Sequence, residues 1–545
     1  MNNKRKILFA LLLSLTVSLF ASESLKSIEE EYYDFLFLKG YADRPTLGYR
    51  TLSDSTWEVS KNLVWTDLSL SREESIGDSD FTYRFYGLHV FTSYNSAYPY
   101  GQNDGDLVQG KGLNSSLSGG VRIEGKGLEI TFKPQLSFTQ NLAYAIMPAG
   151  GNYDSSYAYY WSNIDYPQRF GDDPFFSFDW GDSELRYTWK TFTFGVGTQT
   201  MWSGPAYLNP MLHSNNAAGY PKFDFGFRKT SVTLPYVGYI GELEMRVYAG
   251  IPSYSDYYKT GYDTSNKKLI TGLNASYAPS FLPGLTFSFN KLFMTKFSWS
   301  HLREYLPRLF LIPQDNSGDE DGKASFSASW VFPESGFELY GELGIDDYVS
   351  GLLGYVRYPF HTMIYTVGLK KTVDLNVEKN IYGEFFFEWN DNEMSQDFQF
   401  QGDYTFYSHS SCAGYTNNGQ LMGGASAPGG NSQYVGFKVY HSKGQYMFYV
   451  HRTNPDNNYL YSKVAQPEET DADAEAKYFF SYKTTLALGA TADYALSSQL
   501  WIHGGVVYEL VLNALYKTDA PSDQKFDKDM VLNNFRGEFG ITYSW

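Results

Sequence analysis

The chain has 545 residues and a formal net charge of −17 at neutral pH. This acidity excludes binding to nucleic acid, whose phosphate backbone requires a basic surface, and a single cysteine excludes an internal disulfide framework. Tyr, Phe and Trp together make up 18% of the residues, an abundance typical of membrane barrels that expose aromatic side chains to lipid.

The first 22 residues have the pattern of a secretory signal peptide. Basic residues at 4–6 precede an apolar run at 7–20, and Ala21 or Ser22 suits the cleavage site. An uncleaved membrane anchor is the alternative, but the run is short for a transmembrane helix and a polar stretch follows it. We therefore predict an exported protein whose mature chain begins near residue 23.

Residues 23–45 form a separate segment in the sequence. Apolar side chains recur with helical spacing between Ile28 and Leu38, which predicts a short helix on the periplasmic side. Pro45 favours extended chain directly afterwards. The helix could contact a periplasmic partner or dock to the rest of the protein, and docking is the simpler expectation.

Residues 46–545 carry a dominant period of two, with strands beginning near residue 80. In the stretch 241–249, charged side chains occupy every second position and apolar side chains lie between them. A β-strand produces this division because successive side chains point to opposite faces. We expect the charged face to line a lumen, where its side chains are solvated or form ion pairs between strands. The residues of this kind are Glu184, Arg186, Glu242, Glu244, Arg246, Glu338 and Glu342.

Many predicted strands form hairpins, and long polar segments separate them. Short turns fall at 125–127, 190–191, 333–336 and 442–444, and longer polar segments at 141–183, 200–220, 391–432 and 453–477. Short turns at one end and long loops at the other are typical of outer-membrane barrels. The pattern predicts an all-β fold, a transmembrane antiparallel β-barrel of about 18 strands.

The last predicted strand ends the chain. Its apolar face runs from Phe535 through Phe539 to Trp545, and its other face is polar. A final strand that ends in an aromatic residue resembles the recognition signal of outer-membrane barrels. This signal predicts contact with the barrel-insertion machinery. The apolar outer face of the strands predicts contact with outer-membrane lipids.

The sequence contains no recognisable catalytic, cofactor or metal motif. His213 and Ser214 adjoin, but neighbours on a strand point apart and no orienting carboxylate is evident. The acidic run at 468–475 lacks the spacing of a calcium loop and is expected to be a solvated outer loop. Cys412 is expected to be a small side chain in a loop. We predict that the protein is not an enzyme.

Three stretches have a distinctive composition. They read FTSYNSAYPYGQNDG at 91–105 with QGKG at 109–112, PQRFGD at 167–172, and WSGP at 202–205 with LHSNNA at 212–217. In these stretches the chain resembles the capsule-assembly outer-membrane proteins of the Wzi type. The resemblance implies a large barrel that binds and anchors capsular or other exopolysaccharide at the cell surface.

If the short turns are periplasmic, all three stretches belong to the extracellular end, where they meet at the mouth or fold into it as a plug. Aromatic rings there could stack on sugar rings, amides could bind hydroxyl groups, and basic groups could face sugar carboxylates. The candidate polysaccharide-binding residues are Tyr94, Asn95, Tyr98, Tyr100, Asn103, Asp104, Gln109, Lys111, Arg169, Asp172, Trp202, Tyr207, His213, Asn215 and Asn216. The alternative function is a porin or solute channel, for which an acidic lumen would favour cations.

Overall fold

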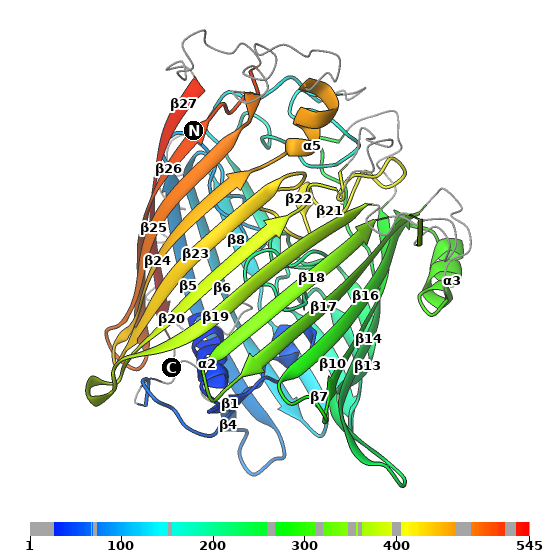
Figure 1. Cartoon of the computed structure of the whole chain (residues 1–545), viewed down its shortest axis with the longest axis vertical. Coiled ribbons are helices and arrows are strands. Elements are labelled where there is room, and N and C mark those ends of the chain that lie inside the picture. Colours follow the sequence, from blue (N-terminus) through cyan, green and yellow to red (C-terminus); the bar gives the residue numbers. More distant parts are fainter. Residues whose placement is uncertain are drawn as a thin grey trace.

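The described residues form a closed antiparallel β-barrel of 18 strands (Figure 1). This computed structural model describes residues 27–66, 68, 73–150, 155–258, 267–311, 320–346, 356–357, 362–394, 405–464, 481–517 and 530–543. The expected signal peptide, the acidic run at 468–475 and Trp545 lie outside them. The last strand pairs with the first, from Arg536 opposite Asn95 to Tyr543 opposite Leu88, and this pairing leaves the wall without a free edge.

The wall strands are consecutive in the chain and pair with their neighbours. They are β5 (Thr82–Asn95), β6 (Gly112–Gly125), β7 (Leu128–Phe132) continued by β8 (Gln135–Thr139), β9 (Phe175–Asp179) continued by β10 (Glu184–Trp189), β11 (Phe192–Gly197), β13 (Lys222–Leu234), β14 (Gly238–Gly250), β15 (Lys268–Pro279), β16 (Leu285–Lys296), β17 (Asp321–Phe332), β18 (Phe337–Asp346), β19 (Met363–Asn376), β20 (Ile381–Asp391), β23 (Asn431–His441), β24 (Gly444–Asn454), β25 (Thr484–Ala495), β26 (Leu500–Leu512) and β27 (Val531–Tyr543).

Shorter elements lie beside the wall or inside it. They are α2 (Ile28–Leu38), β1 (Ala42–Asp43), β2 (Tyr49–Arg50), η1 (Leu52–Asp54), β3 (Glu58–Val59), β4 (Glu73–Ser75), β12 (Trp202–Ser203), α3 (Trp299–Arg308), η2 (Val377–Lys379), β21 (Thr416–Asn417), β22 (Gln420–Leu421), α5 (Asn457–Tyr459) and η3 (Leu460–Val464). Among the described residues, no helix is long and apolar enough to cross a membrane.

The predicted hairpins are confirmed, and they define two ends of the barrel. The tight turns gather at the turn end, whereas the long connections gather at the loop end (Figure 1). One part of the predicted loop 141–183 is wrong, because residues 175–179 form β9 and pair with β8. Pro134 separates β7 from β8, since proline has no backbone N–H for the ladder.

The wall presents an apolar outer face, as the period of two predicts. Phe194, Leu339 and Phe539 alternate with inward polar residues, and each keeps about half of its surface exposed. Exposed aromatic residues gather near both strand ends, the arrangement of membrane-interface girdles. They include Trp189, Phe192 and Trp330 toward the turn end, and Tyr94, Phe176, Trp389 and Phe535 toward the loop end.

Helix α2 has the predicted bounds and docks inside the turn end of the barrel (Figure 1). Ser27 caps its first turn by accepting a hydrogen bond from the N–H of Glu30. Its apolar side Tyr32 and Phe35 packs on Trp65 and Tyr440, so the helix is anchored to the β23 wall. The expectation of docking is therefore confirmed.

The wall begins at β5, as expected from strands that start near residue 80. Residues 46–66, which the prediction grouped with the barrel, precede the wall and pack against its inner side. Segments 158–166, 201–220 and 405–422 also turn inward and share a buried core with the inner wall, including Tyr248, Ile270 and Met294. We call these four lumenal segments the plug.

Wall carboxylates hold the plug through its backbone. Glu244 accepts hydrogen bonds from the N–H groups of residues 47–49 at 2.8–3.3 Å, and Glu388 accepts from those of residues 207–209 at 2.6–3.2 Å. We expected solvation or ion pairs between strands for such lumenal carboxylates. That expectation is wrong for Glu244, because the plug replaces the water that would otherwise solvate it.

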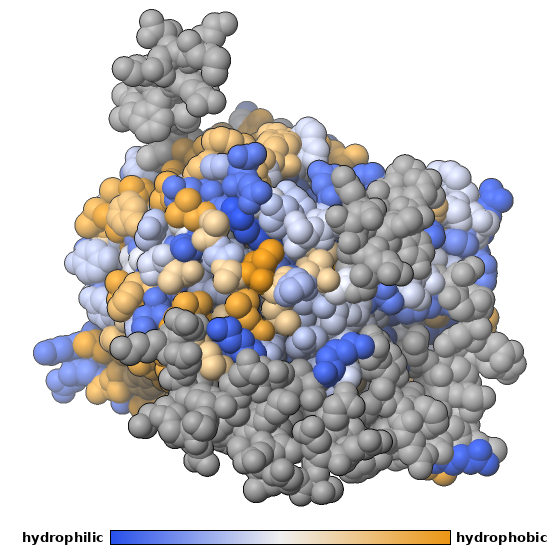
Figure 2. All heavy atoms as spheres, turned by 90° about the horizontal axis from the view of Figure 1, so that it is seen from above, coloured by the Kyte–Doolittle hydropathy of each residue, from blue (hydrophilic) through white to orange (hydrophobic). Residues whose placement is uncertain are grey.

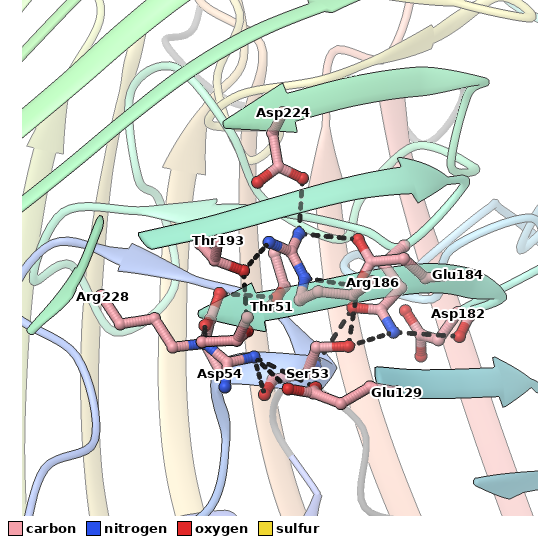
Figure 3. A network of polar contacts seen from close by, with 12 residues as sticks. Thr51, Ser53, Asp54, Glu129, Asp182, Glu184, Arg186, Thr193, Asp224 and Arg228 are labelled. Atoms are coloured by element: carbon pink, nitrogen blue, oxygen red, sulfur yellow. Dashed lines mark hydrogen bonds and ion pairs between the residues drawn. The ribbon is translucent and has the colours of Figure 1, made fainter. Parts of the chain in front are cut away.

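A buried ionic network fixes the N-terminal part of the plug to the wall (Figure 3). The carboxylate of Asp54, in η1, lies 2.9 Å from Arg246 and 2.9 Å from Arg228. Arg186 binds Glu184 and Asp224 in the same network. Here the expected pairing between strands is confirmed, and Asp54 adds a plug carboxylate to it.

Candidate functional site

The loop end contains a cavity of about 440 Å³ between the plug and the inner face of β23–β27. We call it the loop-end cavity. Viewed from this end, the described atoms form a mixed surface of hydrophilic and hydrophobic residues over the barrel (Figure 2). The side chains that give the cavity its character are Tyr98, Tyr100, Asp104, Tyr144, Tyr160, Tyr166, Tyr434, Tyr449, His451, Lys483, Glu509, Arg536 and Glu538.

A buried carboxylate places part of the aromatic lining. Asp456 accepts hydrogen bonds from the hydroxyl groups of Tyr159 and Tyr160, at 2.7 and 3.1 Å, and from the indole N–H of Trp161. Burial raises the pKa of Asp456, and these donors oppose the rise. The contact joins segment 158–166 to the connection after β24, so the tyrosine rings are held at the cavity in advance.

The cavity combines ring faces with polar groups. Tyr98 and Tyr144 meet edge to face, with centroids 5.4 Å apart, and Lys483 donates a 2.8 Å hydrogen bond to the hydroxyl of Tyr98. Arg536 lies 2.8 Å from Glu538 and also donates to the backbone oxygen of Tyr100. Such a surface offers both stacking and hydrogen bonds to a polyhydroxylated ligand.

Asp104 gives the cavity a titratable group. Burial is the largest cause that raises its pKa, to about 6, and Arg536 opposes the rise. The carboxyl group therefore changes charge just below neutral pH. The charge of the cavity wall depends on pH in that range.

A smaller side cavity of about 200 Å³ adjoins the first across residues 99–104 and 166–168. Arg169 lines this cavity and is mostly buried. Its guanidinium donates to the backbone oxygen of Asn141 at 2.8 Å and pairs with Asp172 at 2.8 Å. Gln109 lines it as well and accepts a 2.6 Å hydrogen bond from Ser93. These predicted residues border a cavity while their polar groups support the surrounding loops.

Several predicted residues hold the loops together. Asn95 donates to the backbone oxygens of Tyr100 and Gly110, each at 3.1 Å, and Asn216 accepts from the N–H of Asn103 at 3.2 Å. The backbone oxygen of Asn215 accepts a hydrogen bond from Gly105. Asn103 also adopts a positive φ of 59°, the conformation of a turn residue.

Other predicted residues lie away from the cavities. Tyr94 points outward from β5 with 49% of its surface exposed, because it alternates with the inward Ser93 and Asn95. Asp172 is exposed and accepts a hydrogen bond from Tyr157 at 2.5 Å, a contact that lowers its pKa. Lys111 donates to the backbone oxygen of Ala143 at 3.1 Å.

Most of the third stretch descends into the barrel and lies away from the loop-end cavity. Trp202 and Tyr207 line another cavity, of about 450 Å³, at the turn end. Tyr207 reaches α2 there and donates to Glu31 at 3.0 Å. His213 is buried between Tyr220 and Tyr415, and burial lowers its pKa to about 3. The stretches therefore converge only in part. Asn216 lines the side cavity together with residues of the first two stretches, whereas the rest of the third stretch forms part of the plug.

Several residues of the loop-end cavity were not predicted from the sequence. Tyr434, Tyr449 and His451 project inward from the loop-end halves of β23 and β24, and Lys483 precedes β25. The alternation of each strand places these side chains on the inner face, so parity could have identified large aromatic residues near the mouth. It could not have shown which of them the plug leaves accessible.

A closed 18-stranded barrel with an apolar outer face and a plugged lumen defines an outer-membrane β-barrel protein. The chain belongs to the capsule assembly protein Wzi family, whose sequence profile matches residues 99–505. The resemblance drawn from the three sequence stretches is thus confirmed. In such barrels the turn end is periplasmic and the loop end is extracellular.

The structure is similar to that of Escherichia coli Wzi, described as an outer membrane protein involved in group 1 capsule assembly and a carbohydrate binding β-barrel. The TM-score is 0.52 at 11% identity, over 84% of this chain and 85% of that one, which shows a shared fold. Pseudomonas putida OprB gives 0.36 at 11% identity, over 86% and 94% of the two chains. Acinetobacter baumannii OccAB2 gives 0.39 at 11% identity, over 84% and 97%. Comparison with curated protein sequences gives no match.

Proposed function

We propose that this protein binds capsular or other exopolysaccharide in the loop-end cavity and holds it at the outer surface of the outer membrane. The cavity carries the proposal, because it brings several tyrosine rings and charged hydrogen-bonding groups together at the extracellular end. Family membership supports the same role in capsule assembly. Sugar rings stack on aromatic faces, and their hydroxyl groups exchange hydrogen bonds with amides and charged side chains.

Tyr166 offers a direct test of binding. It lines both the loop-end and side cavities and is partly exposed, so its ring is available to a ligand. We expect Tyr166→Ala to lower the affinity of the full-length, detergent-solubilised protein for capsular polysaccharide extracted from the encoding strain. The expected loss is about fivefold to tenfold, the effect of one lost stacking contact of about 1 kcal/mol. The measurement is biolayer interferometry on immobilised polysaccharide.

A matched control makes the same tyrosine-to-alanine change at the opposite end of the barrel. Tyr236→Ala alters a fully exposed tyrosine in the β13–β14 turn at the periplasmic end, and we expect it to bind polysaccharide normally. Equal affinities for the two variants would contradict the placement of the site. In cells, a deletion strain complemented with Tyr166→Ala should release capsule into the medium. Normal capsule retention in the deletion strain itself would contradict the function.

We further propose that the protein acts by binding and not by catalysis. The predicted pair His213 and Ser214 supports this, because both are buried and their side chains bind plug groups. Prolonged incubation of the purified protein with the polysaccharide should leave its chain length unchanged by size-exclusion chromatography. A shortened polymer would overturn this part of the proposal.

A conductance measurement distinguishes the porin alternative from polysaccharide binding. Plug segments occupy the lumen, and the carboxylates Glu244 and Glu388 that would favour cations are engaged by plug N–H groups. We expect no stable cation-selective current from the full chain in planar bilayers. A steady open pore would favour the channel function instead.

Two further partners are proposed from the wall and its last strand. The exposed apolar outer face fits the acyl chains of outer-membrane lipids. The alternating final strand β27, whose Phe535 and Phe539 point outward, fits recognition by the barrel-insertion machinery. Phe539→Asp should reduce the amount of folded protein in isolated outer membranes, which heat-modifiable electrophoretic mobility measures.

A further inference from the structure

Helix α3 lies outside the barrel, beside the loop end of β16 (Figure 1). Its buried residues Tyr305 and Leu309 pack on Val247, Leu273 and Phe293. These three wall residues belong to the outer face, because they alternate with inward polar residues such as Arg246 and Asn274 on the same strands. The helix therefore covers wall that would otherwise face lipid.

The level of α3 follows from the strand that leads into it. Phe293 is three residues below the loop-end terminus of β16 at Lys296, a distance of roughly 10 Å along the strand. Phe287, further down the same strand, is 46% exposed on the outer wall. The helix thus sits at the extracellular edge of the apolar wall, where acyl chains meet headgroups.

The uncovered side of α3 and its C-terminal turn are strongly apolar. Trp299, Phe310 and Leu311 expose 68%, 59% and 61% of their surfaces. Large side chains exposed to this degree on the outer wall are those that face lipid elsewhere in the barrel. Because α3 covers the wall, the exposed apolar side chains of α3 occupy the lipid-facing position of the wall residues beneath them.

Basic groups accompany the apolar residues. Arg303 is exposed on the same side as Trp299, one helical turn later. Lys296 is not part of this surface, because it lies opposite the inward Lys268 and belongs to the inner face of β16. Lys291 donates to the backbone oxygens of Arg308 and Leu311, at 3.0 and 2.6 Å, and so fixes the C-terminal turn.

Two carboxylates, one on the helix and one beside it, pair with Arg308. Glu304 lies 3.3 Å from Arg308, and the buried Glu320 lies 2.9 Å from it, so both are engaged by one arginine. The described residues around α3 therefore carry a local basic excess in a chain whose net charge is −17. Positive charge beside exposed apolar residues is the pattern of a helix that lies on an anionic lipid surface.

We propose that α3 is an interfacial helix that binds anionic, phosphate-bearing lipid headgroups of the outer leaflet. Trp299, Phe310 and Leu311 enter the upper acyl region, while Arg303 lies at the level of the phosphates. The helix thereby adds a lipid contact to one sector of the barrel, next to the extracellular loops. This inference does not depend on polysaccharide binding.

Site-directed spin labelling tests the position of the helix. The full chain carries Cys412→Ser, which removes its buried native thiol, and a nitroxide at Leu311→Cys or, as a control, at Val237→Cys in the exposed β13–β14 turn. In vesicles of phosphatidylcholine and phosphatidylglycerol, the label at 311 should be accessible to oxygen and shielded from an aqueous nickel reagent. The label at 237 should show the reverse.

Either of two other results at position 311 overturns the proposal. Access to the aqueous reagent equal to that at 237 would place the segment in water. Shielding from both reagents would mean that protein, such as a second copy of the chain, covers the surface. Heat-modifiable electrophoretic mobility confirms that each labelled chain is folded.

Native mass spectrometry tests the lipid headgroup. Arg303→Gln should lower the preference of the solubilised protein for phosphatidylglycerol over phosphatidylcholine by about fivefold. A matched control, Lys379→Gln, makes the same charge change at an exposed periplasmic turn and should keep the preference. Equal preferences for both variants would overturn the proposed headgroup contact.

Discussion

Asp54 should be a principal attachment of the plug to the barrel wall. Its carboxylate lies 2.9 Å from both Arg246 and Arg228, and its side chain and that of Arg246 are almost completely buried. Asp54→Asn keeps the shape and removes the charge, which leaves Arg246 with Asp224 at 3.3 Å. Breaking a buried ion pair by removing one partner costs about 3–5 kcal/mol. The wall ladder closes without Asp54, so we expect the cost to appear as opening of residues 46–66.

The assay is hydrogen exchange of the full-length protein in detergent, followed by mass spectrometry. A cost of about 3 kcal/mol raises the open population about a hundredfold, so the peptide over 47–55 should exchange about a hundredfold faster. Asp374→Asn is the matched control, because Asp374 pairs with Lys39 at 2.7 Å but is 51% exposed. An exposed pair contributes about 0–1 kcal/mol, so exchange there should change less than about fivefold.

The attachment of the plug through Asp54 should also depend on pH. Burial opposes ionisation of Asp54, but the nearby Arg246 and Arg228 outweigh it and hold the pKa of its carboxyl below the usual value. Because the pKa of Asp54 is lower in the folded state, its ionised carboxylate contributes its full stabilisation above the unfolded-state pKa of about 4. This contribution declines as the pH falls below that value. Unchanged exchange in Asp54→Asn at neutral pH would refute the assignment of this network as the attachment of the plug.

Three further predictions concern the plug and the loop-end cavity. Glu388→Gln weakens a charged acceptor for three backbone N–H groups, so exchange at residues 207–209 should rise about tenfold or more in the same assay, and unchanged exchange would contradict the attachment. Asp104 loses its proton as pH rises through about 6, so affinity for an acidic polysaccharide should fall roughly fivefold between pH 5 and pH 7 in biolayer interferometry. Asp104→Asn should reduce that dependence, and an unchanged dependence would assign the effect to another group. Tyr94→Ala removes a ring on the outer wall and should leave polysaccharide affinity unchanged, whereas a loss would place the site elsewhere.

The sequence by itself determined the barrel and much of its topology. Alternation within strands such as 241–249 separates a polar from an apolar face, and turn residues such as those at 190–191 fix where the chain reverses. Both signals are local, because a strand's side-chain directions and a turn's backbone angles depend on neighbouring residues. The helix over 28–38 was predictable for the same reason.

The tertiary structure decided what fills the lumen. The inward side of Glu388 follows from the alternation of β20, but its partners at 207–209 come from a loop about 180 residues earlier in the chain. Nothing local distinguishes a loop that descends into the barrel from one that stays outside, and residues 46–66 show this equally.

The candidate site was divided for the same reason. Tyr98 and Tyr100 reached the loop-end cavity, whereas Trp202 followed its loop down to the cavity at the turn end. Tyr449 and Lys483 joined the loop-end cavity from strands and loops more than 300 residues away. Which rings remain open to a ligand is set by how the plug packs against the wall, and that packing depends on contacts between distant parts of the chain.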